Sequence, residues 1–238
     1  MRRLVSIYVL LLLLPAACDG GTEPASRADP APAPTPAGSC ADETGAVPKE
    51  GTLEGDVDGD GEPDIITLLV NETGSRGCKA FVVVDTATAD LLAPITDENI
   101  EFSLGFPTLN VLAEIDDRPG MEVVVDITAG ASTAFVGVFS AAGDSLERIR
   151  VNADALPYGD LFPYGGSVGH LEGSDCAPGG GVVISVATPA GKRYRLERSF
   201  FTFSGPALEL GDSERRRIDI EALQRFPEFA GPAFASCD

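Results

Sequence analysis

The sequence contains no tryptophan, two methionines and a single histidine, His170, among its 238 residues. A zinc site built from several histidines is therefore excluded, and a Ser-His-Asp arrangement would have to use His170. No nucleophile elbow or oxyanion-loop pattern frames the nearest serines, Ser167 and Ser174. We interpret His170 as a loop residue without a catalytic role.

Basic residues are also scarce, because 17 lysines and arginines stand against 37 aspartates and glutamates, a formal net charge of −20. Such a surface repels the phosphates of nucleic acids and of anionic lipids. We therefore expect no nucleic-acid partner and surroundings that supply free divalent cations.

Long apolar runs are absent except at residues 4–14, which follow a basic start and lead through small residues to Cys18. This run is shorter than the roughly 20 residues that span a bilayer, and it is typical of a secretory signal. A cysteine after small residues resembles the lipobox of bacterial lipoproteins, although Pro15 stands where leucine is usual. The resemblance implies a signal peptide over residues 1–17 and acylation of Cys18. It also implies a cell-membrane lipid anchor on the extracytoplasmic face, as in a lipoprotein of actinobacterial type, and the excess of arginine over lysine suggests a high-GC genome. Cleavage followed by secretion is the alternative.

The next segment lacks the apolar residues of a core. Four prolines alternate with alanine and threonine at Pro30, Pro32, Pro34 and Pro36. Alternating prolines favour an extended, semi-rigid chain of about 3 Å per residue. We interpret residues 18–39 as a tether and residues 40–238 as one domain with a core of its own.

Five cysteines leave an even set of four once Cys18 is reserved for a lipid. An even set outside the cytosol predicts two disulfides, with three connectivities open. We favour Cys40–Cys78 with Cys176–Cys237, and the rival is Cys40–Cys237 with Cys78–Cys176.

The most informative stretch is the acidic loop 56–64, which runs directly into the apolar segment 65–70. Calcium takes about six to eight oxygen ligands. Carboxylates at loop positions 1, 3, 5 and 9, together with the backbone carbonyl at position 7, can supply them. We therefore predict one structural calcium ion, and the alternative is an acidic turn that holds no metal. The predicted ligands are Asp56, Asp58, Asp60, Asp64 and the carbonyl of Glu62.

The loop is not an EF-hand, since Thr67 stands at the twelfth position, where an EF-hand has a bidentate glutamate, and a strand follows. Over residues 56–64 it resembles the calcium loops of FG-GAP/VCBS-type repeats, which occur in the propellers of integrin alpha chains. The resemblance implies a propeller-like β repeat around each such loop.

Two weaker copies of the loop and strand follow, beginning at Glu114 and at His170. Each is followed by a glycine turn and a second strand, so we predict three divergent β repeats. In the second copy Arg118 occupies the fifth position, where its guanidinium would replace a cation. Only the first loop is therefore expected to bind an ion. The repeats are placed at about 47–101, 105–155 and 161–211, with a C-terminal segment over 212–238.

The predicted fold class is all-β, because short β-branched strands and glycine turns dominate the chain. Propellers typically have about four to eight blades, more than three repeats provide. We expect either a reduced propeller-like assembly or three small sheets around a pseudo-threefold axis. Ile220, Leu223 and Phe226 recur at helical spacing, which predicts a short C-terminal helix that ends before Pro227.

Function is less constrained than fold. Tyr158, Phe162 and Tyr164 lie in a turn-rich connection and form either a recognition surface or part of the core. The acidic pairs Asp97/Glu98 and Asp116/Asp117 have the residue types that glycoside hydrolysis requires.

The leading prediction is a membrane-tethered extracytoplasmic module, stabilised by calcium, that binds or scaffolds an envelope protein or polysaccharide and is not an enzyme. The alternatives are a calcium-dependent cell-envelope hydrolase that uses a carboxylate pair and a purely structural accessory lipoprotein.

Overall fold

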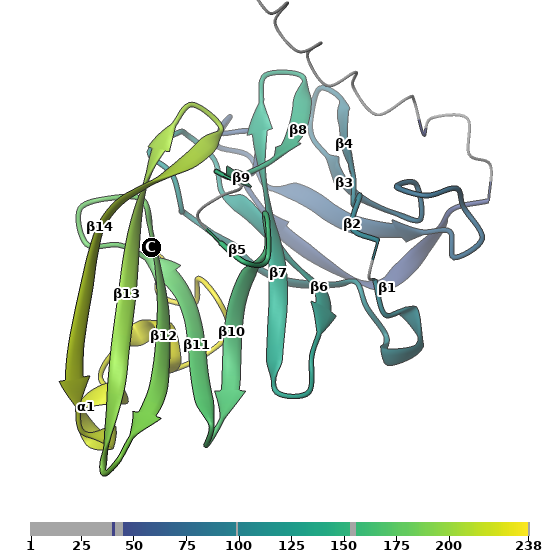
Figure 1. Cartoon of the computed structure of the whole chain (residues 1–238). Helices are drawn as coiled ribbons and strands as arrows, with labels where there is room; N and C mark the ends of the chain where they lie inside the picture. Colours follow the sequence, from purple (N-terminus) through teal and green to yellow (C-terminus); the bar gives the residue numbers. More distant parts are fainter. Residues whose placement is uncertain (1–39, 41–44, 99, 153–155, 238) are drawn as a thin grey trace, which may run out of the picture. The chain divides into compact units, whose positions relative to one another are not determined.

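The computed structural model describes residues 40, 45–98, 100–152 and 156–237, shown in colour in Figure 1. The predicted signal peptide (1–17), Cys18 and the rest of the tether lie outside the described residues. Within the described part of the chain, no helix is long and apolar enough to cross a membrane.

The first sheet is a four-stranded antiparallel meander in chain order. Alternate residues of its second strand, Asp64, Ile66 and Leu68, are buried, whereas Ile65, between the first two, is 50% exposed. This alternation with a period of two is expected of a strand with one face on the core. The strands are β1 (Val47–Gly55), β2 (Asp64–Val70), β3 (Ala80–Asp85) and β4 (Asp90–Pro94).

The second sheet has ten strands in the order β5-β6-β7-β10-β11-β12-β13-β14-β9, with β8 paired to β7. Every pairing is antiparallel except that of β14 with the two-residue strand β9. The strands are β5 (Thr108–Ala113), β6 (Glu122–Ala129), β7 (Thr133–Ala142), β8 (Ser145–Arg148), β9 (Arg150–Val151), β10 (Phe162–Ser167), β11 (His170–Cys176), β12 (Val182–Ala190), β13 (Arg193–Ser204) and β14 (Ala207–Ile218).

Helices are few and short. Among the described residues the single α-helix is α1 (Ile220–Leu223), preceded by Asp219, and a 3₁₀ turn over Pro227–Phe229 follows it. A second 3₁₀ turn covers Phe102–Leu104. The predicted C-terminal helix is therefore confirmed, although it has only four residues.

Two large apolar clusters hold the fold together. The first joins β2, β3 and β4 to Val123, Val125 and Phe139 of the second sheet, so the two sheets share one core. The second lies within the long sheet and includes Phe162 and Phe234, whose rings meet edge to face at 5.2 Å. The C-terminal segment after α1 is thus packed onto the sheet as part of the core.

The arrangement of strands corrects the predicted architecture. The chain is predominantly β, but the described strands form two sheets and neither a closed propeller nor three sheets around an axis. Strand β10 pairs with β7, with Phe162 opposite Val136, and this pairing joins the predicted second and third repeats into one sheet. The third predicted loop, from His170, is strand β11 and not a loop.

The structure pairs Cys40 with Cys78 and Cys176 with Cys237, which is the favoured pairing. The Cα atoms of the two pairs lie 5.5 and 5.4 Å apart, within the usual range for disulfides. Each bridge ties one end of the folded part to a residue 38 or 61 positions away in the sequence.

Candidate metal centre

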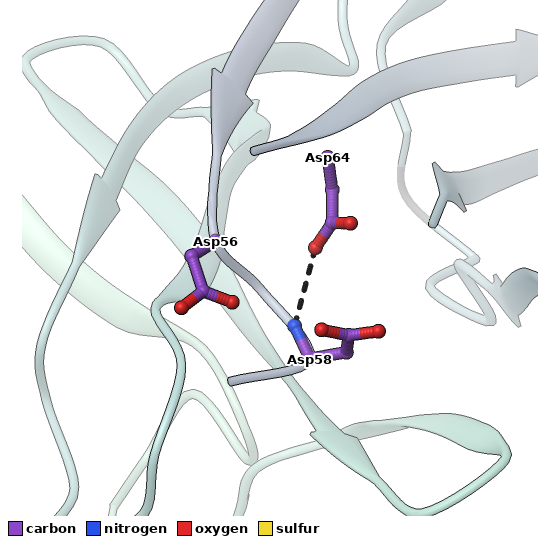
Figure 2. Close-up of side chains that lie close together, drawn as sticks. All are labelled: Asp56, Asp58 and Asp64. Carbon is purple, nitrogen blue, oxygen red and sulfur yellow. Dashed lines mark hydrogen bonds between the residues drawn. The ribbon is translucent and has the colours of Figure 1, made fainter. Parts of the chain in front are cut away.

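The acidic loop connects β1 to β2, and the structure brings three of its carboxylates together (Figure 2). Asp56, Asp58 and Asp64 each offer one oxygen, and these oxygens lie within 4.8 Å of one another. Asp56 directly follows β1 and Asp64 begins β2, and Gly55 pairs with Asp64, so the strand pairing places the two loop ends side by side. The loop therefore curls around the three carboxylates.

Backbone amides hold these carboxylates in place. The Oδ1 atom of Asp56 accepts the N–H of Gly59 at 2.8 Å, and its Oδ2 atom accepts the N–H of Gly61 at 3.0 Å. Both glycines have positive φ, 79° and 90°, a conformation that favours glycine. Asp64 Oδ2 accepts the N–H groups of Val57 at 2.8 Å and of Asp58 at 3.2 Å, the second drawn in Figure 2.

The fourth predicted carboxylate, that of Asp60, lies outside this group. Asp60 and Glu62 are exposed, and Asp60 Oδ1 accepts the N–H of Glu62 at 2.8 Å in a local turn. The structure therefore gathers three of the four predicted carboxylates and leaves Asp60 at the rim of the loop, and the fifth predicted ligand, the carbonyl of Glu62, is a backbone atom that stays a prediction.

The negative charge of the three carboxylates is not neutralised by any described basic residue. Asp64 is 1% exposed, and burial raises the pKa of its carboxyl above the usual value. Repulsion from Asp58 and Asp60 acts in the same direction, whereas the two backbone N–H groups act against it. Among the described residues, no arginine, lysine or histidine forms an ion pair with a carboxylate of this loop. The loop thus concentrates negative charge without a cation from the protein.

This donor set fits calcium. Calcium–oxygen distances are about 2.3–2.6 Å, so two oxygens on opposite sides of one ion lie about 4.6–5.2 Å apart. The 4.8 Å limit among the three carboxylate oxygens meets that requirement. All the donors are hard oxygens and none is sulfur or nitrogen, which favours calcium or magnesium over softer metals. Asp56, Asp58 and Asp64 would hold the ion, and its contribution would be structural.

The second loop, between β5 and β6, has the same backbone-to-carboxylate hydrogen bonds as the first loop, but a different group lies at its centre. Glu122 at the start of β6 accepts the N–H of Ile115 at 2.7 Å and of Asp116 at 3.4 Å, as Asp64 does in the first loop. At the fifth position, Arg118 donates from Nε to Asp116 at 2.6 Å and from Nη2 to Ser140 at 2.9 Å. A guanidinium therefore occupies the centre of the second loop.

The two loops also pack directly against each other. The N–H of Met121 donates to the carbonyl of Asp56 at 2.8 Å. A Cβ atom added to Gly120 would lie 2.3 Å from the carbonyl oxygen of Val57, and one added to Gly59 would lie 2.7 Å from Pro119. The shape of the candidate metal loop is therefore constrained by the neighbouring loop.

Of the two alternatives for the aromatic residues, a recognition surface is wrong for Phe162, because its side chain is fully buried in the core. Tyr158 and Tyr164 are half-buried, and their hydroxyls donate to Glu172 at 2.6 Å and to Asp126 at 2.7 Å. Burial, followed by these carboxylate contacts, raises the pKa of Tyr158 to about 12 and raises that of Tyr164. Both rings therefore secure carboxylates inside the fold.

The acidic pairs considered for hydrolysis are mostly engaged by arginine. Asp97 pairs with Arg148 at 2.5 Å and Glu98 with Arg76. Asp116 is held by Arg118, and with Asp117 it lines a cleft of about 480 Å³ beside the second loop.

The only histidine does not complete a catalytic triad. His170 lies in β11, with its Nε2 atom 3.1 Å from the Thr133 hydroxyl and 3.8 Å from Glu172 Oε2. Both partners meet the same ring nitrogen, whereas a triad uses both nitrogens. Ser174 is buried and donates to the carbonyl of Pro163 at 2.9 Å.

Sequence reasoning missed a set of buried carboxylates that organise the long sheet. Glu122 and Asp175 are each 1% exposed, and Glu228 is 2% exposed. Asp175 accepts the hydroxyl of Ser236 at 2.6 Å, and Glu228 accepts from Ser185 at 2.7 Å and Arg198 at 2.8 Å. Only Glu122 carried a signal, as the ninth residue of the second loop.

Comparison with protein-family models, curated proteins and solved structures gives no significant match.

Proposed function

We propose that the chain is a lipid-anchored extracytoplasmic β module, stabilised by one calcium ion, that binds or scaffolds an envelope component and does not catalyse a reaction. The observation that carries this proposal is the contrast between the two loops. In the second loop Arg118 neutralises the centre, whereas the first loop gathers Asp56, Asp58 and Asp64 with no protein cation among the described residues.

The location proposed for the domain is supported by its covalent chemistry. Two disulfides are typical of proteins outside the reducing cytosol. The apolar run before Cys18 and the proline-rich tether after it agree with an anchored domain. The anchor would keep the module close to the membrane while the tether sets its reach.

A binding role is favoured because three of the four candidate acids, Asp97, Glu98 and Asp116, pair with arginines and the histidine contacts a hydroxyl. Catalysis needs converging, perturbed groups in a pocket that excludes water. Here the candidate acid pairs face arginines, and His170 contacts a threonine hydroxyl. The cleft beside Asp117 is the place where the hydrolase alternative would be sought.

The calcium site is tested by thermal unfolding with calcium and with a chelator. Extracellular calcium modules bind at about 10⁻⁴–10⁻³ M, so about 10 mM calcium would stabilise the fold by roughly 1.4–2.7 kcal/mol. For a domain of this size that is a rise in the melting temperature of about 3–10 °C. Asp58→Ala removes a proposed ligand whose side chain accepts one local N–H, and it should abolish the response.

The matched control is Glu50→Ala, which removes an exposed acid from β1, outside the loop. This variant should keep the full response to calcium. Equal melting temperatures of the wild type with calcium and with chelator would show an acidic turn that holds no metal.

The anchor is tested separately by mass spectrometry of the N-terminal peptide from native membranes. An acylated Cys18 is expected, and an unmodified Cys18 or a chain beginning at Asp19 would contradict anchoring. Purified protein should also lack turnover of peptidoglycan or polysaccharide. Turnover that is lost in Asp117→Asn would favour the hydrolase.

A further inference from the structure

The longest hairpin of the fold, β13–β14, concentrates arginine in a chain that is otherwise strongly acidic (Figure 1). The net charge of the whole chain is −20, so a group of exposed arginines stands apart from the rest of the surface. The arginines of the two strands are Arg193, Arg195, Arg198, Arg215, Arg216 and Arg217.

The register of the hairpin divides these side chains between its two faces. Arg195 pairs with Arg217 and Glu197 pairs with Arg215, and cross-strand partners share a face. Leu196 and Arg216 point to the other face, where the guanidinium of Arg216 lies 4.7 Å from the ring centre of Phe226. Arg195 and Arg217 are therefore direct neighbours on the face away from Phe226.

The two neighbouring cross-strand pairs differ in their charge balance. Arg215 lies 3.4 Å from the carboxylate of Glu197, so that pair is neutral. Arg195 and Arg217 form no ion pair with any described residue. Like charges directly opposite each other destabilise a sheet. The hairpin thus retains an unfavourable Arg195–Arg217 pair beside the favourable Glu197–Arg215 pair on the same face.

Protection of the sheet edge explains only part of this arrangement. Beyond Leu208, β14 has β13 as its one strand partner among the described residues, and charged side chains on such an edge deter aggregation. That role needs charges on β14 alone and is served equally by mixed pairs. It does not account for a second arginine on the inner strand, opposite Arg217.

The surface between these side chains is hollowed. A depression of about 300 Å³ is lined by Arg195, Glu197, Arg215, Arg216 and Arg217. It is open, and Arg195, Arg215 and Arg217 share this face of the hairpin, whereas the guanidinium of Arg216 lies on the other. An anion placed between Arg195 and Arg217 would relieve their mutual repulsion and accept hydrogen bonds from both guanidinium groups.

We propose that the Arg195–Arg217 pair is a binding site for a phosphate group. A phosphate monoester carries a charge of about −1.5 to −2 and three terminal oxygens, which matches two opposed guanidinium forks in both charge and donors. A carboxylate offers two oxygens and one charge, so one arginine satisfies it. The phosphate is supplied by a soluble molecule or by a lipid headgroup. The site is independent of the calcium loop and of the anchor.

The test uses the full chain and glycerol 3-phosphate, because inorganic phosphate precipitates calcium. Titration should shift the side-chain N–H resonances of Arg195 and Arg217 in NMR spectra. Arg195→Gln should weaken binding at least tenfold. Arg193→Gln removes one charge from the same strand, but Arg193 is already paired with Asp219 at 2.9 Å, so this variant should bind like the wild type.

A second variant separates binding from folding. Arg195→Glu creates a Glu–Arg pair like that of Glu197 with Arg215, so it should raise the melting temperature without ligand and abolish binding. Equal weakening by Arg195→Gln and Arg193→Gln would show a general charge effect and overturn the site. Absence of any titration by the wild type would also overturn it, unless the vesicles described next bind.

The source of the phosphate is decided with vesicles and Cys18→Ser, in which no lipid on Cys18 contributes. Retention on phosphatidic acid/phosphatidylcholine vesicles but not on pure phosphatidylcholine, lost in Arg195→Gln, assigns the site to the phosphate monoester of a lipid headgroup. Binding of glycerol 3-phosphate without vesicle retention assigns it to a soluble phosphate. Absence of both kinds of binding refutes the proposal.

Discussion

Replacing Glu122 by glutamine should change how the stability of the fold depends on pH. Glu122 is 1% exposed at the start of β6, where it also accepts the hydroxyl of Ser140 at 3.0 Å. Burial, with repulsion from Asp116, raises the pKa of its carboxyl from 4.5 to about 7, against the opposing hydrogen bonds. The variant keeps the shape of the side chain and removes the titration.

The sign of the effect follows from where the proton is held. Between pH 4.5 and 7 the carboxyl is protonated in the folded chain and ionised in the unfolded chain. The folded state then binds more protons, so the free energy of unfolding falls as the pH rises. The contribution of Glu122 is fully present below pH 4.5 and is lost as the pH rises through about 7.

The size of the effect follows from the same values. A tenfold difference in proton affinity corresponds to about 1.36 kcal/mol, so the shift of Glu122 from 4.5 to about 7 gives roughly 3 kcal/mol. This is an upper limit, since the nearby guanidinium of Arg118 attracts the ionised form of Glu122. We expect between about 1 and 3 kcal/mol.

Urea unfolding of the wild type and of Glu122→Gln from pH 4.5 to 8.5 measures this term. The difference between the two free energies of unfolding cancels the titration of the other acids. It should be near zero at pH 4.5 and favour the variant by about 1–3 kcal/mol at pH 8.5. A difference that stays constant with pH would refute the reasoning, because it would show that Glu122 does not change its pKa on folding.

Four further substitutions, compared in two pairs, test the packing. Gly120→Ala should destabilise the fold by roughly 2–4 kcal/mol, since φ is 100° and the new Cβ would meet the carbonyl of Val57, whereas Gly61→Ala, with open space around it, should be milder. Phe162→Ala should cost about 3–5 kcal/mol as a fully buried ring, and Tyr158→Phe about 1 kcal/mol as the loss of one hydrogen bond. Both comparisons are made by chemical denaturation, and a tolerated Phe162→Ala would mean that the ring is not part of the core.

Local sequence patterns predicted the elements of the fold well. The apolar segments after the acidic loops are β2 and β6, and the segment Val182–Ile184 lies in β12. Consecutive cysteines pair as favoured, and α1 begins after Asp219. For the strands and the helix the signal lies within a few residues, because burial on a strand or helix is determined by neighbouring positions, whereas the disulfides join cysteines 38 and 61 residues apart.

Long-range partnership could not be predicted. Strand β11 can contain the polar residues Glu172, Ser174 and Asp175 because their side chains form hydrogen bonds with residues elsewhere in the chain, such as Tyr158 and Ser236. A sequence pattern treats such residues as a loop. The joining of β7 to β10 depends on a register that no local signal specifies, so the single long sheet was missed.

The candidate site was predicted in its position and only partly in its composition. The spacing of acids identified the loop, but which carboxylates converge depends on the backbone turns at Gly59 and Gly61. These turns direct Asp56 inward, whereas Asp60 bonds to the amide of Glu62 at the rim.

The disulfide connectivity bears on the order in which the bridges would form during the proposed export. Cys40 pairs with Cys78, and Cys176 pairs with Cys237, so in a chain exported with its N-terminus first each native partner would be the next cysteine to emerge. Oxidation in order of emergence then gives the native bridges without reshuffling. A free thiol at Cys18 would meet Cys40 before Cys78 did, so an acyl group on Cys18 would also remove a competitor for the first bridge.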